Sequence, residues 1–573
     1  MPIHNKQVAE QFSRLADLLE IQGANTFRVR AYRNAAQTVE SLPRDAQEML
    51  DDGEDLSELP GIGADLAGKI EEIIKNGELA LLQETEEQTT AELGEMMKLP
   101  GVGPKRVKAI HDALGVESLG QLKEAAEKRQ VRQLEGFGRK TEAMILREIE
   151  RRKDHEQRTK LSSVDPIARS LEQYLSGIDG VKKVVVAGSY RRRKETVGDL
   201  DILITCKDDS PVMDRFVEYD EIEEVVEHGR TRSMVILQSG LQVDLRVMPE
   251  VCYGAALYYF TGSKAHNIAV RRIAQEEGLK INEYGVFRGE DRIAGATEEE
   301  VFQQVGLPFI PPELRENRGE VEAAKAGALP QLIALGDVRG NLHAHTKDSD
   351  GKYTLQQMAQ AARQAGLEYL AITDHSRAVA AVKGLDAKGL RKQIERIDAL
   401  NDELSGIRIL KGIEVDILED GSLDLDDHVL GELDLVVGSI HSKFNLPKKK
   451  QTERVIRAMD HVCFHILGHP TGRLINEREP YEIDIERIMD AALDRGCYME
   501  LNAQPDRLDL NDAHCKLARE KGLKVAISVD AHSTTDLEFM RFGIDQARRG
   551  WLEADDVLNT RTWGELKGLL KRD

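Results

Sequence analysis

Six apolar strands between residue 336 and the C-terminus place the strongest constraint on the fold, because each ends in a side chain that can bind a metal. Their sequences are LAITDH, ILKGIEVD, LVVGSIH, HILGHP, YMELN and VAISVDAH, with helical segments between them. Strands that alternate with helices predict a parallel β/α layout. In a β/α barrel the functional side chains lie at the C-terminal ends of the strands. We therefore expect a barrel with a polar site at one end.

Histidines and carboxylates at these strand ends, and in the preceding segment NLHAHTKDSDG, form a candidate metal centre. Burying so many of them would be costly without cations. A mixture of nitrogen and oxygen ligands suits Zn²⁺, Mn²⁺ or Fe²⁺. The predicted ligands are His343, His345, Asp350, His375, Glu414, His441, His469, Asp530 and His532.

A second set of carboxylates lies earlier in the chain. In a strand, side chains two residues apart point to the same face, so Asp199 and Asp201 converge while Leu200 faces the core. Asp244 stands in a later alternating run, LQVDLRV. Three carboxylates on adjacent strands repel one another strongly without counter-charge. Two divalent cations would remove that repulsion, and such a site transfers phosphoryl or nucleotidyl groups.

The first 150 or so residues are predicted to be all-helical and contain a repeat. LPGIGADLAGKI (59–70), LPGVGPKRVKAI (99–110) and LEGFGRKTEAMI (134–145) share an apolar residue, Gly-x-Gly and an amphipathic run. The glycines permit a tight turn that exposes N–H groups at the start of the second helix, where a phosphate can bind. The pattern is typical of helix-hairpin-helix units, which grip the DNA backbone without reading its sequence. The expected DNA contacts are Gly61, Gly63, Gly101, Gly103 and Lys105.

Composition is compatible with these sites. A chain of 573 residues is too long for one core, so about three or four domains are expected. The net charge of −22 does not exclude nucleic acid, because binding depends on the local field, and basic residues cluster in RVRAYR (28–33) and RRRK (191–194). The five cysteines form no CxxC pair, and no apolar run suggests a signal or a membrane span. We expect a cytoplasmic protein.

The motifs GSYRRRKETVGDLDILI, VDLRVM and LYYFTGSKAHN, together with the hairpins, resemble the family X DNA polymerases, which include polymerase beta. The resemblance covers about residues 1–318 and implies an α+β nucleotidyltransferase palm followed by a thumb. Asp199, Asp201 and Asp244 would hold two Mg²⁺ or Mn²⁺ ions. Arg271 would contact DNA near the nascent base pair. Nucleotide-binding roles are implied for Gly188, Ser189, Arg192, Gly198, Tyr259, Phe260, Gly262 and Asn267.

Two positions depart from the polymerase beta pattern. Lys264 stands where that enzyme has an aspartate near the incoming base, so base contacts are not carried over. Lys69 matches its Schiff-base lysine, which removes 5′-deoxyribose phosphate. However, Asp65 and Leu81 replace basic residues there. Lys69 is therefore either a lyase nucleophile or a residue that contacts only DNA phosphate or solvent.

The strand-end motifs resemble the PHP (polymerase and histidinol phosphatase) domain, a metal-dependent phosphoesterase. All nine ligand positions of that family are filled, which implies a distorted (β/α)7 barrel with three Mn²⁺, Zn²⁺ or Fe²⁺ ions. The expected domains are 1–85 lyase-like with a helix-hairpin-helix, 86–155 fingers-like helix-hairpin-helix, 156–255 palm, 256–318 thumb, 319–335 linker and 336–573 PHP domain.

The order of the domains along the chain, helix-hairpin-helix repeats, then polymerase core, then PHP domain, resembles that of the bacterial family X polymerases. It implies a monomeric, nucleoid-associated repair enzyme that adds dNTPs to a primer 3′-OH at short gaps in base excision repair. The PHP domain would act as a 3′→5′ exonuclease, with abasic-site cleavage and 3′-phosphate removal as further activities. Two alternatives stay open: a small-molecule phosphatase fused to a nucleotidyltransferase, and a non-catalytic DNA-binding scaffold.

Overall fold

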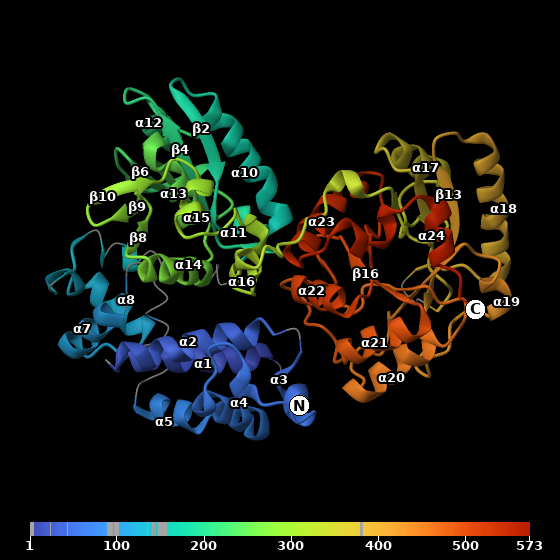
Figure 1. Ribbon diagram of the computed structural model, residues 1–573, viewed down its shortest axis with the longest axis horizontal. Helices are drawn as coiled ribbons and strands as arrows, with labels where there is room; N and C mark the ends of the chain where they lie inside the picture. The colour runs from blue at the N-terminus through green and yellow to red at the C-terminus, as the bar shows by residue number, and fades with distance from the viewer. Residues whose placement is uncertain are drawn as a thin grey trace. The chain divides into compact units, whose positions relative to one another are not determined.

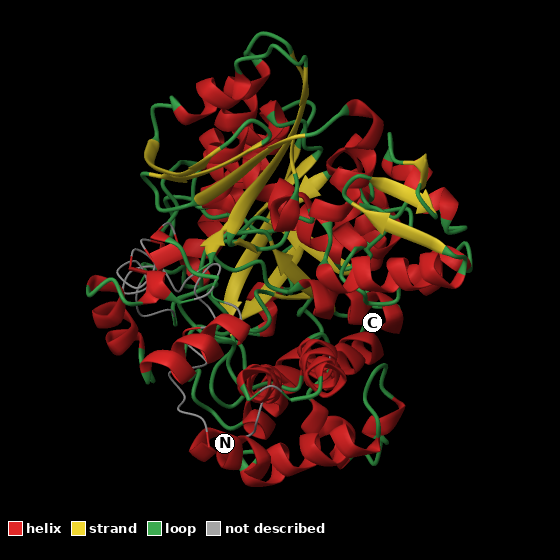
Figure 2. Cartoon of the chain, turned by 90° about the vertical axis from the view of Figure 1, so that its left-hand side faces the viewer, coloured by secondary structure: helices red, strands yellow, loops and turns green. Residues whose placement is uncertain are grey.

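The computed structural model describes residues 5–22, 24–42, 44–88, 96, 102, 104–134, 136–139, 141, 142, 144–146, 158–378 and 382–572. Contacts divide the chain into two compact units, Met1–Glu156 and Gln157–Asp573 (Figure 1). All strands of the described residues belong to the second unit, where they stand out in yellow in Figure 2. The predicted order of an all-helical region followed by α/β regions is confirmed.

The first unit is built from short helices around one apolar core. In α4 the buried residues recur at helical spacing, from Leu66 to Ile70 and Ile74, and form the face that packs on this core. Before α4, Gly61 adopts a left-handed φ of +79° and Gly63 is the N-cap, as the first hairpin repeat requires. The helices are α1 (Asn5–Ile21), α2 (Thr26–Glu40), α3 (Ala46–Asp51), α4 (Ala64–Asn76), α5 (Ala80–Gln88), α7 (Pro104–Leu114) and α8 (Leu119–Glu127).

The second unit begins with a five-stranded mixed sheet in the order β2-β4-β7-β6-β5. β4 and β7 are parallel neighbours, whereas the other pairs in the sheet are antiparallel. The elements are β1 (Thr159–Lys160), α10 (Leu161–Ser176), β2 (Val181–Val186), α11 (Gly188–Arg191), β3 (Thr196–Val197), β4 (Asp199–Cys206), α12 (Val212–Val217), β5 (Ile222–His228), β6 (Arg232–Leu237) and β7 (Gln242–Val247).

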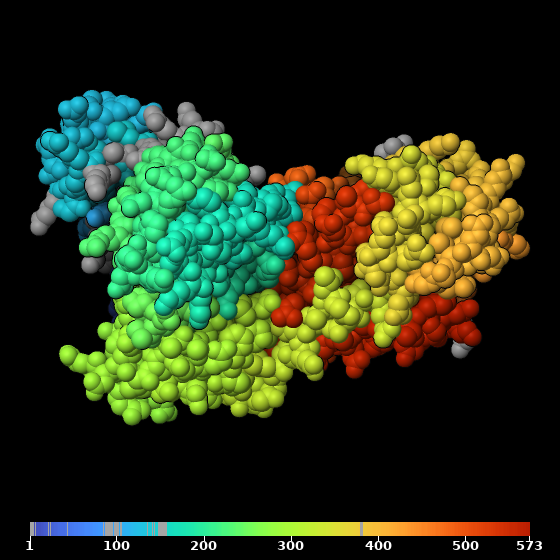
Figure 3. Space-filling view, turned by 90° about the horizontal axis from the view of Figure 1, so that it is seen from above, coloured from blue at the N-terminus to red at the C-terminus, as the bar shows by residue number. Residues whose placement is uncertain are grey.

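A small helical and β subdomain follows the sheet, and a connecting segment then leads to the barrel. The subdomain begins with two consecutive helices, α13 and α14. Figure 3 shows the connecting segment, in lime to yellow, along the surface between the two parts. The elements are α13 (Tyr253–Thr261), α14 (Lys264–Glu276), β8 (Leu279–Asn282), β9 (Gly285–Arg288), β10 (Asp291–Ala294), α15 (Glu298–Gln304) and α16 (Glu320–Lys325).

Seven parallel strands, in chain order from β11 to β17, form the last part of the chain. Ala344, just after β11, forms a parallel bridge to Ala531, just after β17, so the two edges meet and nearly close a barrel. The predicted distorted (β/α)7 barrel is therefore confirmed. The elements are β11 (Gly340–Asn341), α17 (Leu355–Gln364), β12 (Tyr369–Ile372), α18 (Ala387–Glu403), β13 (Arg408–Asp416), α19 (Asp427–Leu430), β14 (Leu435–Ser439), α20 (Lys448–Met459), β15 (Ile466–Leu467), α21 (Ile485–Arg495), β16 (Tyr498–Asn502), α22 (Asp512–Lys521), β17 (Val525–Ser528), α23 (Met540–Arg549) and α24 (Trp563–Leu569).

Alternation along the strands places the polar residues inside this barrel. Leu370 and Ile372 belong to the core shared with the surrounding helices, whereas Tyr369 and Ala371 belong to a second core with Leu566 of α24. The strands are thus apolar on both faces, as parallel strands covered on both sides must be. The same period of two directs strand-end side chains into the interior at the C-terminal ends of the strands.

Candidate functional site: two clusters of titratable residues

The first cluster consists of the three palm carboxylates. β4 and β7 are paired in a register that sets Asp201 directly beside Asp244. Leu200, between the two β4 carboxylates, is fully buried, whereas Asp199 at the start of the strand is exposed. The structure therefore places Asp201 and Asp244 side by side on adjacent strands, and Asp199 stands two residues before Asp201 on β4.

The charges of this cluster are only partly compensated within the protein. Burial, together with the carboxylates of Asp199 and Asp244, raises the pKa of Asp201 to about 7. Although Asp199 is exposed at the surface, partial desolvation by the surrounding protein and the Asp244 carboxylate raise its pKa, against the opposing effect of Arg158. Asp244 is paired with Arg232, whose Nη2 lies 2.6 Å from Asp244 Oδ2, and with Arg246. A site in which two carboxyl groups resist ionisation until a cation arrives fits divalent metal ions.

Gly188 lies against this cluster and opens α11. Its φ is +61°, and a Cβ added there would lie 2.8 Å from Asp201 Oδ2. Glycine is therefore needed both for the backbone angle and for the close approach to a predicted metal ligand. Ser189 follows in α11, and Lys194 N–H donates to the Ser189 carbonyl, which curls the chain back after the helix.

Arg192 lies between the palm and the end of α13. Its Nε donates to Glu316 Oε1 at 2.9 Å and its Nη1 donates to the carbonyl of Thr261. A Cβ on Gly262 would lie 3.6 Å from Arg192 Nη1, so the predicted nucleotide-binding residues 192 and 262 are neighbours. Asn267 Nδ2 donates to the Tyr259 carbonyl at 2.7 Å.

The other predicted palm and thumb contacts are less closely gathered. Tyr259 and Phe260 pack edge to face, with ring centroids 5.2 Å apart, and both rings are partly exposed. Arg271 Nε donates to the Asn267 carbonyl, one turn earlier in α14. Gly198 approaches Arg158, whose Nη1 would lie 3.1 Å from an added Cβ.

The second cluster gathers the nine predicted ligands of the barrel. Eight of them form overlapping groups whose ligand atoms lie within 4.8 Å of one another. His469 joins them through Glu414, since His469 Nε2 lies 3.0 Å from Glu414 Oε1. The groups are His345, Asp350, His375 and His532; His343, His345 and Asp530; and His375, Glu414 and His441.

Electrostatics in this cluster depend on a dense mixture of imidazoles and carboxylates. Burial lowers the pKa of His375, but Glu414 and Asp350 outweigh burial and raise it to about 10. His345 behaves in the opposite way, because burial and the neighbouring His532 lower its pKa to about 4. The pKa of Asp530 is held well below its usual value, despite burial, by the surrounding histidines. A donor set of this kind, at strand ends inside a barrel, fits several divalent cations.

Residues behind the ligands hold them in place, and they were not among the nine predicted metal ligands. Glu500 Oε1 accepts from His343 Nδ1 at 2.7 Å, while Glu500 Oε2 accepts the His469 N–H at 2.6 Å. Asp416 Oδ1 lies 3.2 Å from His441 Nδ1. Asn502 Nδ2 donates to Asp530 Oδ2 at 3.1 Å. The strand-end pattern YMELN contained this signal, because Glu500 shares the inward face with Asn502.

The predicted DNA contacts of the first unit are only partly described. Gly61 and Gly63 lie in the turn before α4, as expected. Gly101, Gly103 and the Lys105 side chain lie outside the described residues. Lys69 is ion-paired with Asp65 and lies 6.0 Å from the centroid of the Tyr32 ring. This pairing opposes a free amine, so the two interpretations of Lys69 stay open.

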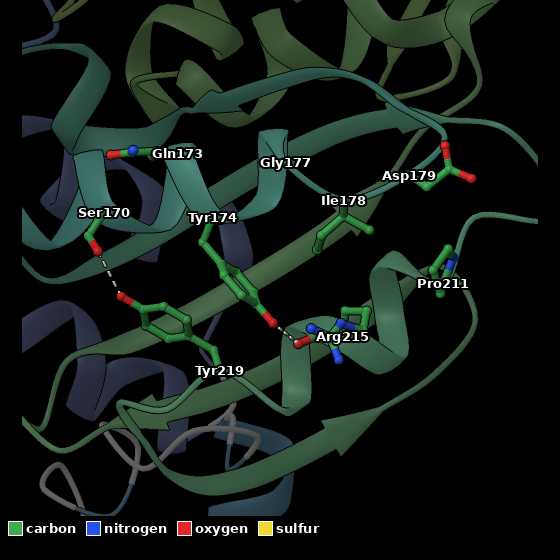
Figure 4. A pocket seen from close by; sticks show the side chains of 9 residues that line it. All are labelled: Ser170, Gln173, Tyr174, Gly177, Ile178, Asp179, Pro211, Arg215 and Tyr219. Atoms are coloured by element: carbon green, nitrogen blue, oxygen red, sulfur yellow. Dashed lines mark hydrogen bonds between the residues drawn. The ribbon is translucent and has the colours of Figure 1, made fainter.

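A shallow pocket lies at the opposite end of β4 from the carboxylates, between α10 and α12 (Figure 4). Tyr174 and Tyr219 line it with ring centroids 4.9 Å apart. The Tyr219 hydroxyl forms a hydrogen bond with the Ser170 hydroxyl, and the Tyr174 hydroxyl donates a hydrogen bond to the Arg215 carbonyl. Both tyrosine hydroxyls that line this pocket therefore already have protein partners.

Known families match the chain along most of its length. The matches are described as Helix-hairpin-helix domain (residues 3–79), SAM-like Helix-hairpin-helix tandem (93–151), DNA polymerase beta palm (162–273), DNA polymerase beta thumb (256–316) and PHP domain (341–504).

Relatives match the whole chain or parts of it. "DNA polymerase/3'-5' exonuclease PolX" of Bacillus subtilis (strain 168) is 39% identical over 575 residues, covering 100% of both chains. "DNA polymerase lambda" of Arabidopsis thaliana is 28% identical over 55% of this chain and 62% of its own length. "Probable phosphatase Teth514_1060" of Thermoanaerobacter sp. (strain X514) is 30% identical over 40% of this chain and 93% of its own length.

Proposed function

Because this chain belongs to the family X DNA polymerases that carry a C-terminal PHP domain, we propose that it fills short DNA gaps and digests 3′ ends in the 3′→5′ direction. The observation that carries the proposal is the presence, in one chain, of the Asp201–Asp244 register and of the barrel cluster, in which His469 joins eight grouped ligands through Glu414. Its substrates would be dNTPs and gapped or primer-template DNA. It would act as a monomer in the bacterial cytoplasm, on nucleoid DNA.

In the palm, Asp199, Asp201 and Asp244 would hold two Mg²⁺ or Mn²⁺ ions, which lower the pKa of the primer 3′-OH and neutralise the triphosphate. Gly188 and Ser189 would donate N–H and hydroxyl groups to the phosphates. Within the described residues, Arg192 donates hydrogen bonds from Nε and Nη1, which leaves its Nη2 for a charge-assisted contact with phosphate.

In the barrel, the nine strand-end residues would hold three Mn²⁺, Zn²⁺ or Fe²⁺ ions, which activate water for attack on a phosphoester. Glu500 and Asp416 would fix the tautomers of His343 and His441, leaving the Nε2 atoms for the metals. The match to a relative named a probable phosphatase supports 3′-phosphate removal as a second activity of this site. Cleavage at abasic sites is proposed on the same chemistry.

The domain limits remain part of this proposal. We place a lyase-like domain at 1–85, a fingers-like region at 86–155, the palm at 156–255, the thumb at 256–318, a linker at 319–335 and the PHP domain at 336–573. Lys69 is the proposed lyase nucleophile or, alternatively, a phosphate contact. Borohydride trapping on a 5′-deoxyribose-phosphate substrate separates the two roles, because only the first gives an adduct that Lys69→Ala abolishes.

Site-directed separation of the two activities tests the proposal. Asp244→Ala should abolish nucleotide incorporation at a one-nucleotide gap while 3′ digestion continues. The double variant His343→Ala/His345→Ala should stop 3′ digestion while incorporation continues. Both activities should be assayed in Mg²⁺ and in Mn²⁺. Full incorporation by Asp244→Ala, or full digestion by the double variant, would refute the corresponding assignment.

A further inference from the structure

The loop that follows α11, residues 192–195, forms a hydrogen bond and two ion pairs with the PHP barrel. Arg549 Nη1 donates to the Arg192 carbonyl at 2.7 Å. Arg193 Nε lies 3.2 Å from Asp545. Arg473 forms a bidentate ion pair with Glu195, with nitrogen–oxygen distances of 3.2 and 2.6 Å. Figure 1 shows α23, which contains Asp545 and Arg549, on the side of the barrel turned toward α10 and α11.

Arg549 is linked to the guanidinium of Arg192 as well as to its main-chain carbonyl. Arg549 is 2% exposed and contacts Glu316 at 3.0 Å, and Glu316 in turn accepts from Arg192 Nε. Burial acts to raise the pKa of Glu316, but Arg549, Arg192 and Lys194 outweigh it and lower the pKa to about 2. Glu316 therefore stays ionised between the two arginines and fixes one edge of the Arg192 guanidinium.

The backbone of this loop is held in a conformation that it would not adopt freely. Arg193 has a φ of +56°, which is uncommon for a residue with a Cβ. Its guanidinium is held by Asp165, by Asp545 and by the ring of Tyr190, whose centroid lies 5.1 Å away. Such conformations persist where the surrounding structure determines them, and here part of that structure is the barrel.

One barrel segment contacts both the barrel cluster and the loop after α11. His469, a predicted metal ligand, opens the segment 469–473, and Arg473 closes it. Asp509 Oδ2 accepts the N–H groups of Thr471 and Gly472, both at 2.9 Å, which fixes the loop between these ends. The partner of Glu195 is thus held by the same short segment that supplies a ligand to the barrel cluster.

We propose that Arg473 and Arg549 of the PHP barrel are positioning residues for nucleotide binding in the palm. They hold the segment 188–195, which comprises α11 and the loop after it, so that Ser189 and Arg192 meet the triphosphate of the incoming dNTP. The barrel then supports the structure of the polymerase site, in addition to holding the residues proposed to digest 3′ ends. The inference rests on the proposed polymerase function.

Steady-state incorporation at a one-nucleotide gap tests the inference. Arg473→Ala should raise the KM for the dNTP about tenfold, with a smaller change in kcat, because the phosphate ligands are displaced rather than removed. Glu195→Gln should raise the KM similarly, and the double variant should add little, because both changes break one pair. Arg473→Lys should recover part of the affinity, since it keeps the charge but not the bidentate geometry.

Arg548→Ala is the matched control. Arg548 neighbours Arg549 in α23, but its side chain donates to Glu313 Oε1 at 2.8 Å and to the Ile333 carbonyl at 2.9 Å, and neither partner belongs to the loop. Its KM should stay at the wild-type value, and thermal unfolding should show that all variants are folded. An active wild type with unchanged KM in folded Arg473→Ala and Glu195→Gln would overturn the inference alone. A wild type that incorporates no nucleotide would overturn the proposed function and this inference with it.

Discussion

At the scale of the residue, both clusters depend on close contacts that hold the candidate metal ligands in place. Glu500 is fully buried and binds His343 through one oxygen and the His469 main chain through the other. Gly188 leaves room for Asp201 that no other residue would leave. Sequence spacing identified the metal ligands and Gly188, but it did not identify Glu500 as the partner of His343, because that contact joins β16 to a segment 157 residues away.

Glu500→Gln should lower the affinity of the barrel for Mn²⁺ by about 10- to 100-fold, because a neutral amide orients His343 less strongly than a carboxylate does. The 3′ digestion should fall at limiting Mn²⁺ and recover at high Mn²⁺, while nucleotide incorporation stays constant. Calorimetric titration of the metal-free protein with Mn²⁺ measures the change in affinity. Asp494→Asn, an exposed change in the same domain, is the control. Equal Mn²⁺ affinity in Glu500→Gln and Asp494→Asn would contradict the assignment.

Gly188→Ala should reduce nucleotide incorporation about 100-fold or more, since the new Cβ displaces Asp201 as well as straining the backbone. Gly278→Ala is a matched control, because Gly278 has a similar φ of +68° and no atom within 4 Å of an added Cβ. Gap filling by the two variants should therefore differ greatly while their thermal stabilities stay comparable. Equal loss of activity in both would mean that the contact with Asp201 is unimportant.

At the scale of the element, the barrel strands decide where charge accumulates. Each strand brings a ligand to the same end, so imidazoles and carboxylates compensate one another before any cation binds. Burial opposes the protonation of His375, His441 and His532, yet neighbouring carboxylates raise their pKa values to about 10, 9 and 9. A group whose pKa is raised on folding stabilises the fold fully below its unfolded pKa, near 6.5, and loses this contribution as pH rises through the folded pKa.

The metal-free protein should therefore lose thermal stability as pH rises from about 7 to 10, and metal binding should restore it. Because a cation must displace these protons, the apparent Mn²⁺ affinity should rise over the same range, about tenfold per pH unit for each proton released. Calorimetry in buffers of different ionisation enthalpy counts the protons. His375→Gln should release fewer of them. A Mn²⁺ affinity that does not change with pH would exclude protonated histidines in the metal-free site.

At the scale of the whole molecule, an acidic chain is expected to bind an acidic polymer through local basic tracks. The net charge of −22 opposes association at long range, whereas helix-hairpin-helix turns act on phosphates at short range. The logarithm of the affinity for gapped DNA should therefore fall linearly with the logarithm of salt concentration.

Lys69→Ala should reduce the slope of this salt dependence by about one, as expected for the loss of one phosphate contact. Lys388→Ala, an exposed change in α18 of the barrel, should leave the slope unchanged. Fluorescence anisotropy at several salt concentrations gives both slopes. An unaltered slope for Lys69→Ala would remove Lys69 from the DNA contacts.

The sequence by itself determined the features that depend on local spacing. The Asp199–Asp201 pair, the glycine turn before α4 and the inward ligands at the strand ends all follow from periods of two or 3.6 residues, which fix side-chain direction within an element. Only the tertiary structure decided which elements meet. It set Asp201 beside Asp244, closed the barrel at Ala344 and Ala531, and joined Arg473 to Glu195. These contacts depend on the packing of the whole chain, and no local spacing specifies them.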